Sequence, residues 1–201
     1  MVAQALGAIL AEEDDLEVVA VATTVRAAIE VVERSPVDVV LVDFRLPDGD
    51  GAGVAAAVRA LRPDVRVIVL TAAEATGVVG RAIAAGADGF LHKSEPITEV
   101  VRAIRAVADG DAWFPREALA DLVGDMGPPP TPVGTDLTAR ERDVLELLAR
   151  GASTQAMVEA LVLSPHTVRN HVRNVMAKLG AHSKLEAVTI AASAGIVRLG
   201  V

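Results

Sequence analysis

The stretch VVLVDFRLPDGDG, residues 39–51, decides the fold. It is a continuous apolar run that ends at one acid, Asp43, and then breaks into a turn rich in proline and glycine. A continuous apolar run bounded by turn residues is typical of a parallel strand that is buried on both faces. Asp43 is therefore expected at the carboxyl end of a strand, which is the edge of an open α/β sheet where ligands bind.

Strand and helix patterns alternate on both sides of this stretch. We expect strands at residues 17–22, 38–42, 65–70 and 89–92, and amphipathic helices at residues 1–11, 24–34, 52–61, 76–85 and 97–108. Strict alternation of strands and helices predicts a doubly wound parallel sheet of the α/β class.

The carboxyl-terminal third of the chain has a different pattern. Residues 115–123 are expected to form a short helix, and residues 124–135, GDMGPPPTPVGT, a proline-rich spacer. Beyond the spacer the strand pattern is lost, and only helices with glycine or serine corners follow. The expected helices at residues 138–150, 153–161, 164–179 and 184–194 predict a small all-α domain of the helix-turn-helix kind.

Composition excludes several kinds of protein. The chain of 201 residues is 52% hydrophobic and contains no cysteine, which excludes disulfides, thiolate metal sites and thiol nucleophiles. No apolar stretch approaches the roughly 18 residues of a membrane span, and the amino terminus lacks the pattern of an export signal. We therefore expect a soluble cytoplasmic protein that has no membrane partner.

Charge is distributed unevenly along the chain, whose net charge is −8. Residues 1–110 carry 10 basic and 17 acidic side chains, whereas residues 137–201 carry 8 basic and 5 acidic ones. Only this last segment, with a net charge of +3, has the sign that favours contact with a polyanion such as DNA.

Three polar residues are expected at the carboxyl ends of successive strands, namely Asp43, Thr71 and Lys93. Because parallel strands end at one edge, a carboxylate, a hydroxyl and an ammonium group can face one pocket there. This set suits transfer of a phosphoryl group to Asp43, with Lys93 pairing with the phosphoryl oxygens and Thr71 donating a hydrogen bond to them. A divalent cation such as Mg²⁺ is needed to offset the negative charge.

Residues 165–179 suit a helix that enters the major groove of DNA. One side carries an apolar stripe, and the opposite side carries Arg and Asn, which bind guanine and adenine through paired hydrogen bonds. The expected base-facing residues are Arg169, Asn170 and Arg173, with His166 beside them; the expected phosphate contacts are Thr167 and Lys178; and the expected dimer surface on the last helix is formed by Leu185, Val188 and Ala192.

The motifs on this chain resemble those of a known family. VDFRLPDGDG (residues 42–51), LTA (70–72) and GFLHK (89–93) resemble the receiver domain of two-component response regulators. LTARERDVLELLARGAS and LSPHTVRNHVRNVMAKLGAHSKLEAV resemble the DNA-binding domain of the LuxR/FixJ (NarL) type. The resemblance covers nearly the whole chain and implies a receiver domain at residues 1–110, a short helix and linker at 111–131, and a LuxR-type helix-turn-helix domain at 132–201.

This resemblance implies a flavodoxin-like receiver with strand order 2-1-3-4-5 and a transcription factor that binds promoter DNA as a homodimer and is not an enzyme. It implies that a sensor histidine kinase phosphorylates Asp43 and that the backbone carbonyl of Arg45 helps Asp43 to hold Mg²⁺. It further implies that Phe90 turns inward when Thr71 closes on the phosphoryl group.

One part of the family pattern is absent. Receivers of this family open with a strand that ends in two adjacent acids, and these acids hold the metal ion, whereas residues 1–10 match the helix that follows that strand. We therefore expect the first strand and both acids to be missing from this sequence. One hypothesis is that the natural protein begins earlier and binds Mg²⁺; the rival hypothesis is a short form that neither binds Mg²⁺ nor accepts phosphate.

Two other functions remain to be compared with the phosphorylation switch. In the first, the receiver is a phosphate-independent module that binds a ligand or a protein, and the helical domain still binds DNA. The second, an aspartyl-phosphate phosphatase, usually requires a second acid two residues after the nucleophile, and this chain has Arg45 there. A calcium loop beginning at Asp48 is excluded, because its twelfth position is Arg59 rather than Glu.

Overall fold

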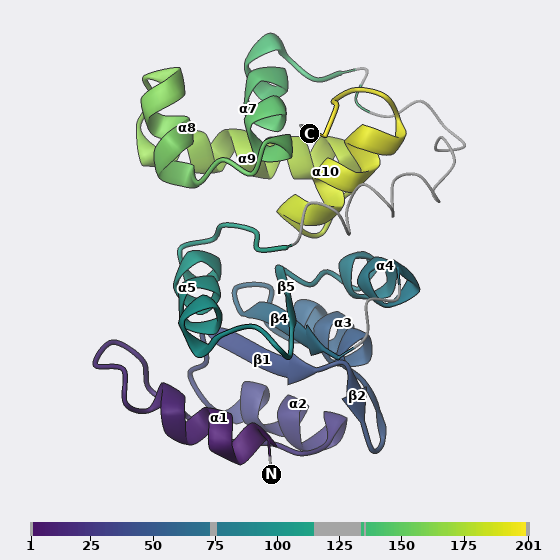
Figure 1. Cartoon of the computed structure of the whole chain (residues 1–201). Helices are drawn as coiled ribbons and strands as arrows, with labels where there is room; N and C mark the ends of the chain where they lie inside the picture. Colours follow the sequence, from purple (N-terminus) through teal and green to yellow (C-terminus); the bar gives the residue numbers. More distant parts are fainter. Residues whose placement is uncertain (1, 73–75, 115–133, 135, 200–201) are drawn as a thin grey trace.

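The structure, a computed structural model, describes residues 2–72, 76–114, 134 and 136–199. An α/β domain before residue 115 lies against a helical domain after residue 135 (Figure 1). The short helix expected at residues 115–123, and all of the expected spacer except Gly134, lie outside the described residues. Within the described ranges, no helix has the length and apolar character needed to cross a bilayer.

The sheet of the α/β domain has three parallel strands in the order β1 (Val39–Asp43), β4 (Arg66–Thr71) and β5 (Gly89–His92). The central strand β4, with the sequence RVIVLT, is buried on both faces except at its first residue. β1 lies at the edge of the sheet, and most of its residues are only half-buried. Three of the four expected strands are therefore confirmed within one or two residues.

Helices cover both faces of the sheet, which confirms the doubly wound arrangement. Ile68 and Leu70 of β4 belong to one apolar cluster, whereas Val67 and Val69 belong to another, because successive side chains of a strand point to opposite faces. The first cluster includes side chains of α1 (Val2–Leu10) and α5 (Ile97–Ala108), and the second includes side chains of α2 (Val25–Arg34), α3 (Gly51–Leu61) and α4 (Thr76–Ala84).

The prediction of a strand at residues 17–22 is wrong, since this segment forms no strand. Its side chains Val18, Val19 and Val21 are 36%, 43% and 45% exposed. The outer edge of β1 has no strand partner among the described residues. A strand forms only where a neighbour satisfies its backbone hydrogen bonds, so an apolar β-branched pattern alone does not suffice.

A short hairpin that the sequence did not predict follows β1. β2 (Arg45–Leu46) pairs antiparallel with β3 (Gly49–Asp50). The N–H of Gly51 then donates to the Phe44 carbonyl at 2.9 Å, and a Cβ atom on Gly51 would lie 3.0 Å from the Asp43 carbonyl oxygen. Glycine at this position therefore lets α3 begin directly against the segment that carries Asp43.

The helical domain contains the expected helices, which are α7 (Ala139–Ala149), α8 (Thr154–Leu161), α9 (Pro165–Leu179) and α10 (Lys184–Ser193). Each begins after a Ser or Thr whose side chain accepts a backbone N–H of the first turn. The expected apolar stripe of α9 is buried along its length, at Val168, Val172, Val175 and Leu179.

A buried carboxylate ties α7 to α9. Glu141 is 4% exposed and accepts hydrogen bonds from the Thr138 N–H, the Thr138 hydroxyl and the Lys178 ammonium group at 2.8, 2.9 and 2.8 Å. The bond from Lys178 is the largest cause that lowers the pKa of Glu141 to about 2. Lys178 also donates to the Asp136 carbonyl at 2.8 Å. Its ammonium group is therefore engaged inside the helical domain rather than left free for a DNA phosphate.

We predict that Glu141 makes the helical domain less stable in acid. Its folded-state pKa of about 2 lies below its ordinary value of 4.5, so its contribution is complete above about pH 4.5 and is lost as the pH falls towards 2. Glu141→Gln should cost about 2 kcal/mol of unfolding free energy at pH 7 and reduce the pH dependence in this window. Urea unfolding followed by circular dichroism measures both effects, and identical pH profiles for the two proteins would contradict the prediction.

Val162, which ends α8, has an unfavourable backbone conformation. Its φ of 54° and ψ of 50° lie in the left-handed region, where no other described non-glycine residue is found. Its side chain is 89% exposed, so almost no packing offsets the cost of this conformation. Glycine commonly ends helices in this way because it has no Cβ to clash with the following backbone.

Val162→Gly should therefore raise the unfolding free energy of the helical domain by about 1 kcal/mol. The gain would be measured as a higher midpoint of thermal or urea unfolding. Val162→Ala serves as the matched control, because it shortens the exposed side chain and keeps the Cβ. A gain from alanine as large as that from glycine would refute the backbone explanation.

Candidate functional site

The carboxyl edge of the sheet brings two of the three expected polar residues into direct contact. Asp43 ends β1, Lys93 follows β5, and the Lys93 ammonium group forms an ion pair with Asp43 Oδ2. The N–H of Lys93 donates to the Thr71 carbonyl at 2.7 Å, which fixes Lys93 against the end of β4. The side chains of Asp43 and Lys93 are 35% and 29% exposed, so a phosphoryl donor in solution can reach them.

Thr71 and Phe90 lie deeper in the domain. Thr71 ends β4 and is 3% exposed. Phe90 in β5 is 5% exposed and belongs to the apolar cluster that contains Phe44 and the α4 residue Ile83. Phe90 therefore already faces the interior in this structure.

The two acids that follow Asp43 in the sequence serve as helix caps. Asp48 accepts the N–H groups of Val25 and Arg26 at 2.7 and 3.2 Å, and these bonds at the start of α2 lower the pKa of Asp48. Asp50 accepts the N–H of Gly53 at 2.8 Å at the start of α3. Both carboxylates thus stabilise helix N-termini.

Mg²⁺ does not fit the described residues as a resident ion. They contain no group of three or more His, Asp or Glu side chains that could hold a metal. Asp43 contributes one carboxylate, which Lys93 already neutralises, and its Oδ1 accepts the N–H of Arg45 at 3.0 Å. Glu13 and Asp15 of the acidic segment after α1 instead form ion pairs with Arg105 of α5.

The polar side of α9 carries a connected set of side chains. Arg169 and Arg173 are exposed, whereas Asn170 is half-buried. Asn170 bonds to His166 Nε2 at 3.0 Å and accepts a hydrogen bond from Arg173 at 3.0 Å. Thr167 bonds to Ser164 at 2.8 Å at the start of the helix. This side therefore presents the charge and the hydrogen-bonding groups that contact with base edges requires.

The polar side of α9 faces the α/β domain across a cleft. Arg169, Asn170 and Arg173 line one side of this cleft, whose volume is about 790 Å³, and Arg66 and Asp88 line the other. Asp88 is buried and forms ion pairs with Arg59 at 2.8 Å and with Arg66 at 3.2 Å. The residues expected to contact DNA thus lie at the boundary between the two domains.

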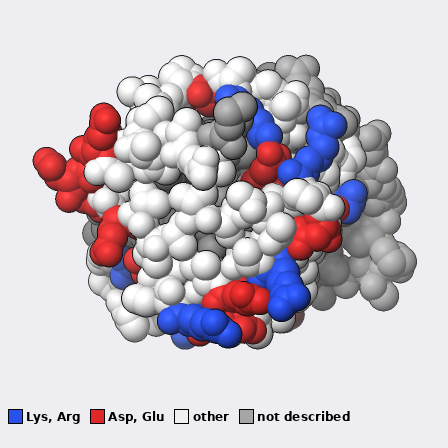
Figure 2. Space-filling view, turned by 90° about the horizontal axis from the view of Figure 1, so that it is seen from below, with Lys and Arg blue, Asp and Glu red and all other residues white. Residues whose placement is uncertain are grey.

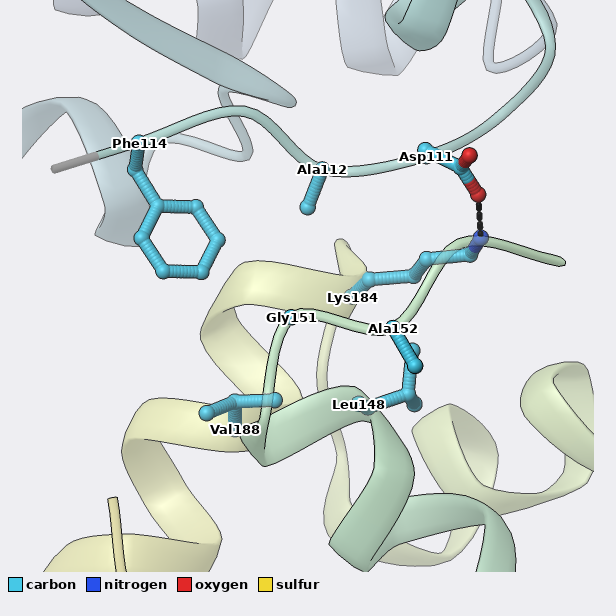
Figure 3. A pocket seen from close by; sticks show the side chains of 8 residues that line it. All are labelled: Asp111, Ala112, Phe114, Leu148, Gly151, Ala152, Lys184 and Val188. Atoms are coloured by element: carbon cyan, nitrogen blue, oxygen red, sulfur yellow. Dashed lines mark hydrogen bonds and ion pairs between the residues drawn. The ribbon is translucent and has the colours of Figure 1, made fainter. Parts of the chain in front are cut away.

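Asp111 joins the two domains at this boundary. Its Oδ1 accepts hydrogen bonds from the N–H and the hydroxyl of Thr154 at 3.0 and 2.9 Å. The same oxygen pairs with the Lys184 ammonium group at 3.4 Å, a contact that Figure 3 shows. Thr154 begins α8 and Lys184 begins α10, so one carboxylate holds the starts of two helices. Burial lowers the pKa of Lys184, and Asp111 opposes this shift. We call Asp111, Thr154 and Lys184 the interdomain clasp.

Sequence reasoning missed the interdomain clasp, because Asp111 lies where a linker was expected and carries no motif. Apolar side chains extend the contact beside it. Ala112 and Phe114 from the α/β domain and Leu148 and Val188 from the helical domain line a small cavity of about 30 Å³ (Figure 3).

The dimer surface expected on α10 is largely buried in this structure. Leu185 and Val188 are 1% and 2% exposed, and both belong to an apolar cluster that includes Val168 and Val172 of α9. Ala192 is half-buried. Leu185 is therefore a core residue rather than a surface residue, because its position on the helix points to α9.

The face of the α/β domain remote from the helical domain offers no comparable surface for DNA. Figure 2 shows this face, where Lys and Arg are interspersed with Asp and Glu around a broad uncharged area. Interspersed charge of both signs does not attract a polyanion. Of the two faces, the polar side of α9 is therefore the better candidate for DNA contact.

Comparison with protein families gives two matches that together cover most of the chain. Residues 1–105 match the response regulator receiver domain. Residues 135–191 match the luxR family of bacterial regulatory proteins.

Individual relatives and a solved structure agree with these matches. The chain is 35% identical to the transcriptional regulatory protein DesR of Bacillus subtilis, over 94% of this chain and 90% of DesR. It is 31% identical to the fimbriae Z protein of Salmonella typhimurium, over 96% of this chain and 92% of that protein. The RcsB response regulator of Salmonella typhimurium shares the fold, with a TM-score of 0.53 at 21% identity over 93% of this chain and 90% of RcsB. The chain therefore belongs to the two-component response regulators that combine a receiver domain with a LuxR-type DNA-binding domain.

Proposed function

We propose that this response regulator is switched by phosphorylation of Asp43 and that α9 carries the DNA-contacting residues. The Asp43–Lys93 ion pair at the open edge of the sheet is the observation that carries the first part. A sensor histidine kinase supplies the phosphoryl group. One Asp43 oxygen forms a bond to phosphorus as the bond from phosphorus to the kinase imidazole breaks, and the imidazole leaves.

The side chains around Asp43 support this chemistry. Lys93 moves from the carboxylate to the phosphoryl oxygens, since these carry more negative charge than the carboxylate alone. Thr71 lies at the end of the neighbouring strand, where its hydroxyl can donate to the same oxygens. In receivers a bound Mg²⁺ supplies charge neutralisation for this transfer, and acids beyond those described here would have to hold it.

The position of α9 supports a switch that acts by separating the domains. An α-helix must enter a major groove about 12 Å wide to contact base edges. Here Arg169 and Arg173, although exposed, line the same cleft as Arg66 and Asp88 of the receiver domain, so that domain lies beside the surface that duplex DNA would occupy. Opening the interdomain clasp exposes both α9 and Val188, and a homodimer through α10 then places two α9 helices on adjacent turns of DNA.

The alternative is a receiver that works without phosphate and binds a protein or a ligand. One observation favours it, which is that the described residues around Asp43 do not fit a resident Mg²⁺ ion. The two functions share the same DNA-binding domain and differ only in the dependence on Asp43.

Asp43→Asn separates these two functions. If phosphorylation is the switch, the variant should lose the increase in DNA affinity that wild type shows after phosphorylation, a change of roughly five- to a hundredfold. Fluorescence anisotropy with duplex DNA recovered from cells together with the protein measures the affinity, and intact mass measures phosphorylation. A variant that regulates its promoters as wild type does would instead support the phosphate-independent receiver.

Asp111→Ala tests the interdomain clasp. Loss of three hydrogen bonds to a carboxylate should favour the open form and raise the DNA affinity of the unphosphorylated protein roughly tenfold, which corresponds to about 1.4 kcal/mol. Asp109→Ala is the matched control, because Asp109 lines the same cleft and its loss removes the same charge. An equal gain in both variants would show that charge alone, and not the clasp, controls affinity.

A further inference from the structure

Helix α4 connects the acid site of the receiver domain to the DNA-binding domain. It packs against α10, directly below it in Figure 1. On its inner side Val79 and Ile83 belong to the same apolar cluster as Phe44 and Phe90. The position of α4 therefore affects both the segment that carries Asp43 and the contact between the domains.

Arg81 is the residue of α4 that reaches the acid site through polar contacts. Its guanidinium group forms an ion pair with Asp50, and its Cζ lies 5.4 Å from the centroid of the Phe44 ring. Phe44 follows Asp43 directly, and Asp50 caps the helix α3 that begins against Asp43. One side chain of α4 therefore contacts two residues that flank the phosphorylation site.

We propose that Arg81 is a positioning residue that conveys a change at Asp43 to α4, and through α4 to the DNA-binding domain. This inference rests on the proposed function of Asp43. Phosphorylation replaces the single charge of the Asp43 carboxylate with the roughly 1.5 to 2 negative charges of an acyl phosphate beside Phe44. The added charge makes the Asp43 segment a stronger partner for Arg81 relative to Asp50. Because the Arg81 side chain is 62% exposed, it can change partners without unpacking the core, and α4 moves with it.

The chemistry of arginine suits this role better than that of lysine. The planar guanidinium group can pair with a carboxylate through its edge while its face covers an aromatic ring, and an ammonium group cannot make both contacts in this way. An exposed ion pair contributes little to stability. A loss of coupling without a loss of stability therefore distinguishes a positioning role from a structural one.

The test compares full-length variants before and after phosphorylation by acetyl phosphate, with the modified fraction measured by intact mass. Arg81→Gln removes the charge, and Arg81→Lys keeps it. Arg26→Gln is the matched control, because Arg26 forms an exposed ion pair with Glu30 on α2. The first readout is the ratio of DNA Kd values without and with phosphorylation. The second is hydrogen exchange of α4 in the unmodified protein.

We expect Arg81→Gln to reduce the ratio of DNA Kd values roughly two- to tenfold. The fraction of protein that acetyl phosphate phosphorylates should stay the same as in wild type. Exchange within α4 should rise while exchange in α7 stays the same. Arg81→Lys should give an intermediate ratio, and Arg26→Gln should match wild type in both readouts.

Two failures are distinguishable. If wild type responds to phosphorylation and Arg81→Gln responds equally, the role of Arg81 is overturned and the phosphorylation switch stands. If wild type itself shows no response, the switch at Asp43 is overturned, and with it the transmission through Arg81. An equal rise in exchange of α4 and α7 in Arg81→Gln would also overturn the proposal, because it indicates general destabilisation.

Discussion

The parallel register of β1, β4 and β5 is the constraint on which the chemistry of this protein depends. Asp43 and Lys93 are 50 residues apart in the chain, yet their side chains meet because both strands end at the same edge. The pairing of Asp43 with Leu70, and of Thr71 with His92, aligns these ends. Asp48 and Asp50, which follow Asp43 closely in the chain, cap helices α2 and α3, so neither takes part in the ion pair between Asp43 and Lys93.

Under the proposed function, the same surfaces serve two competing purposes in the DNA-binding domain. Val188 of α10 lines the cavity against the receiver domain and is also a residue of the proposed dimer surface. Arg169 and Arg173 of α9 line the cleft and are also the proposed DNA contacts. Contact with the receiver domain then competes with contact with DNA, as the proposed two-state switch requires.

Local patterns predicted most of the fold and the meeting of Asp43 with Lys93 at one edge of the sheet, whereas the contacts between the two domains escaped prediction. β1, β4, β5 and the helices of both domains follow from apolar periodicity and capping residues. The segment at residues 17–22 has the same periodicity as a strand, but no local pattern shows whether a neighbouring strand is present. The contacts of Lys178 with Glu141 and of Asp111 with Thr154 were missed for a related reason, since a polar side chain has the same sequence signal whether its partner is DNA, water or another domain.

The open side of β1 also affects how this chain behaves in concentrated solution. Backbone groups of Asp38 and Phe44 bond to β4, so the alternation along the strand turns those of Leu41 outwards, where no strand of the described part of the chain receives them. An unpaired edge near solvent-exposed valines is a template for strand addition between molecules, the first step of fibrillar aggregation. Glu17 and Asp38 are exposed acids in or beside these segments, and the repulsion between such acids on two molecules opposes strand addition. High salt screens this repulsion, and low pH removes it by protonating the carboxylates.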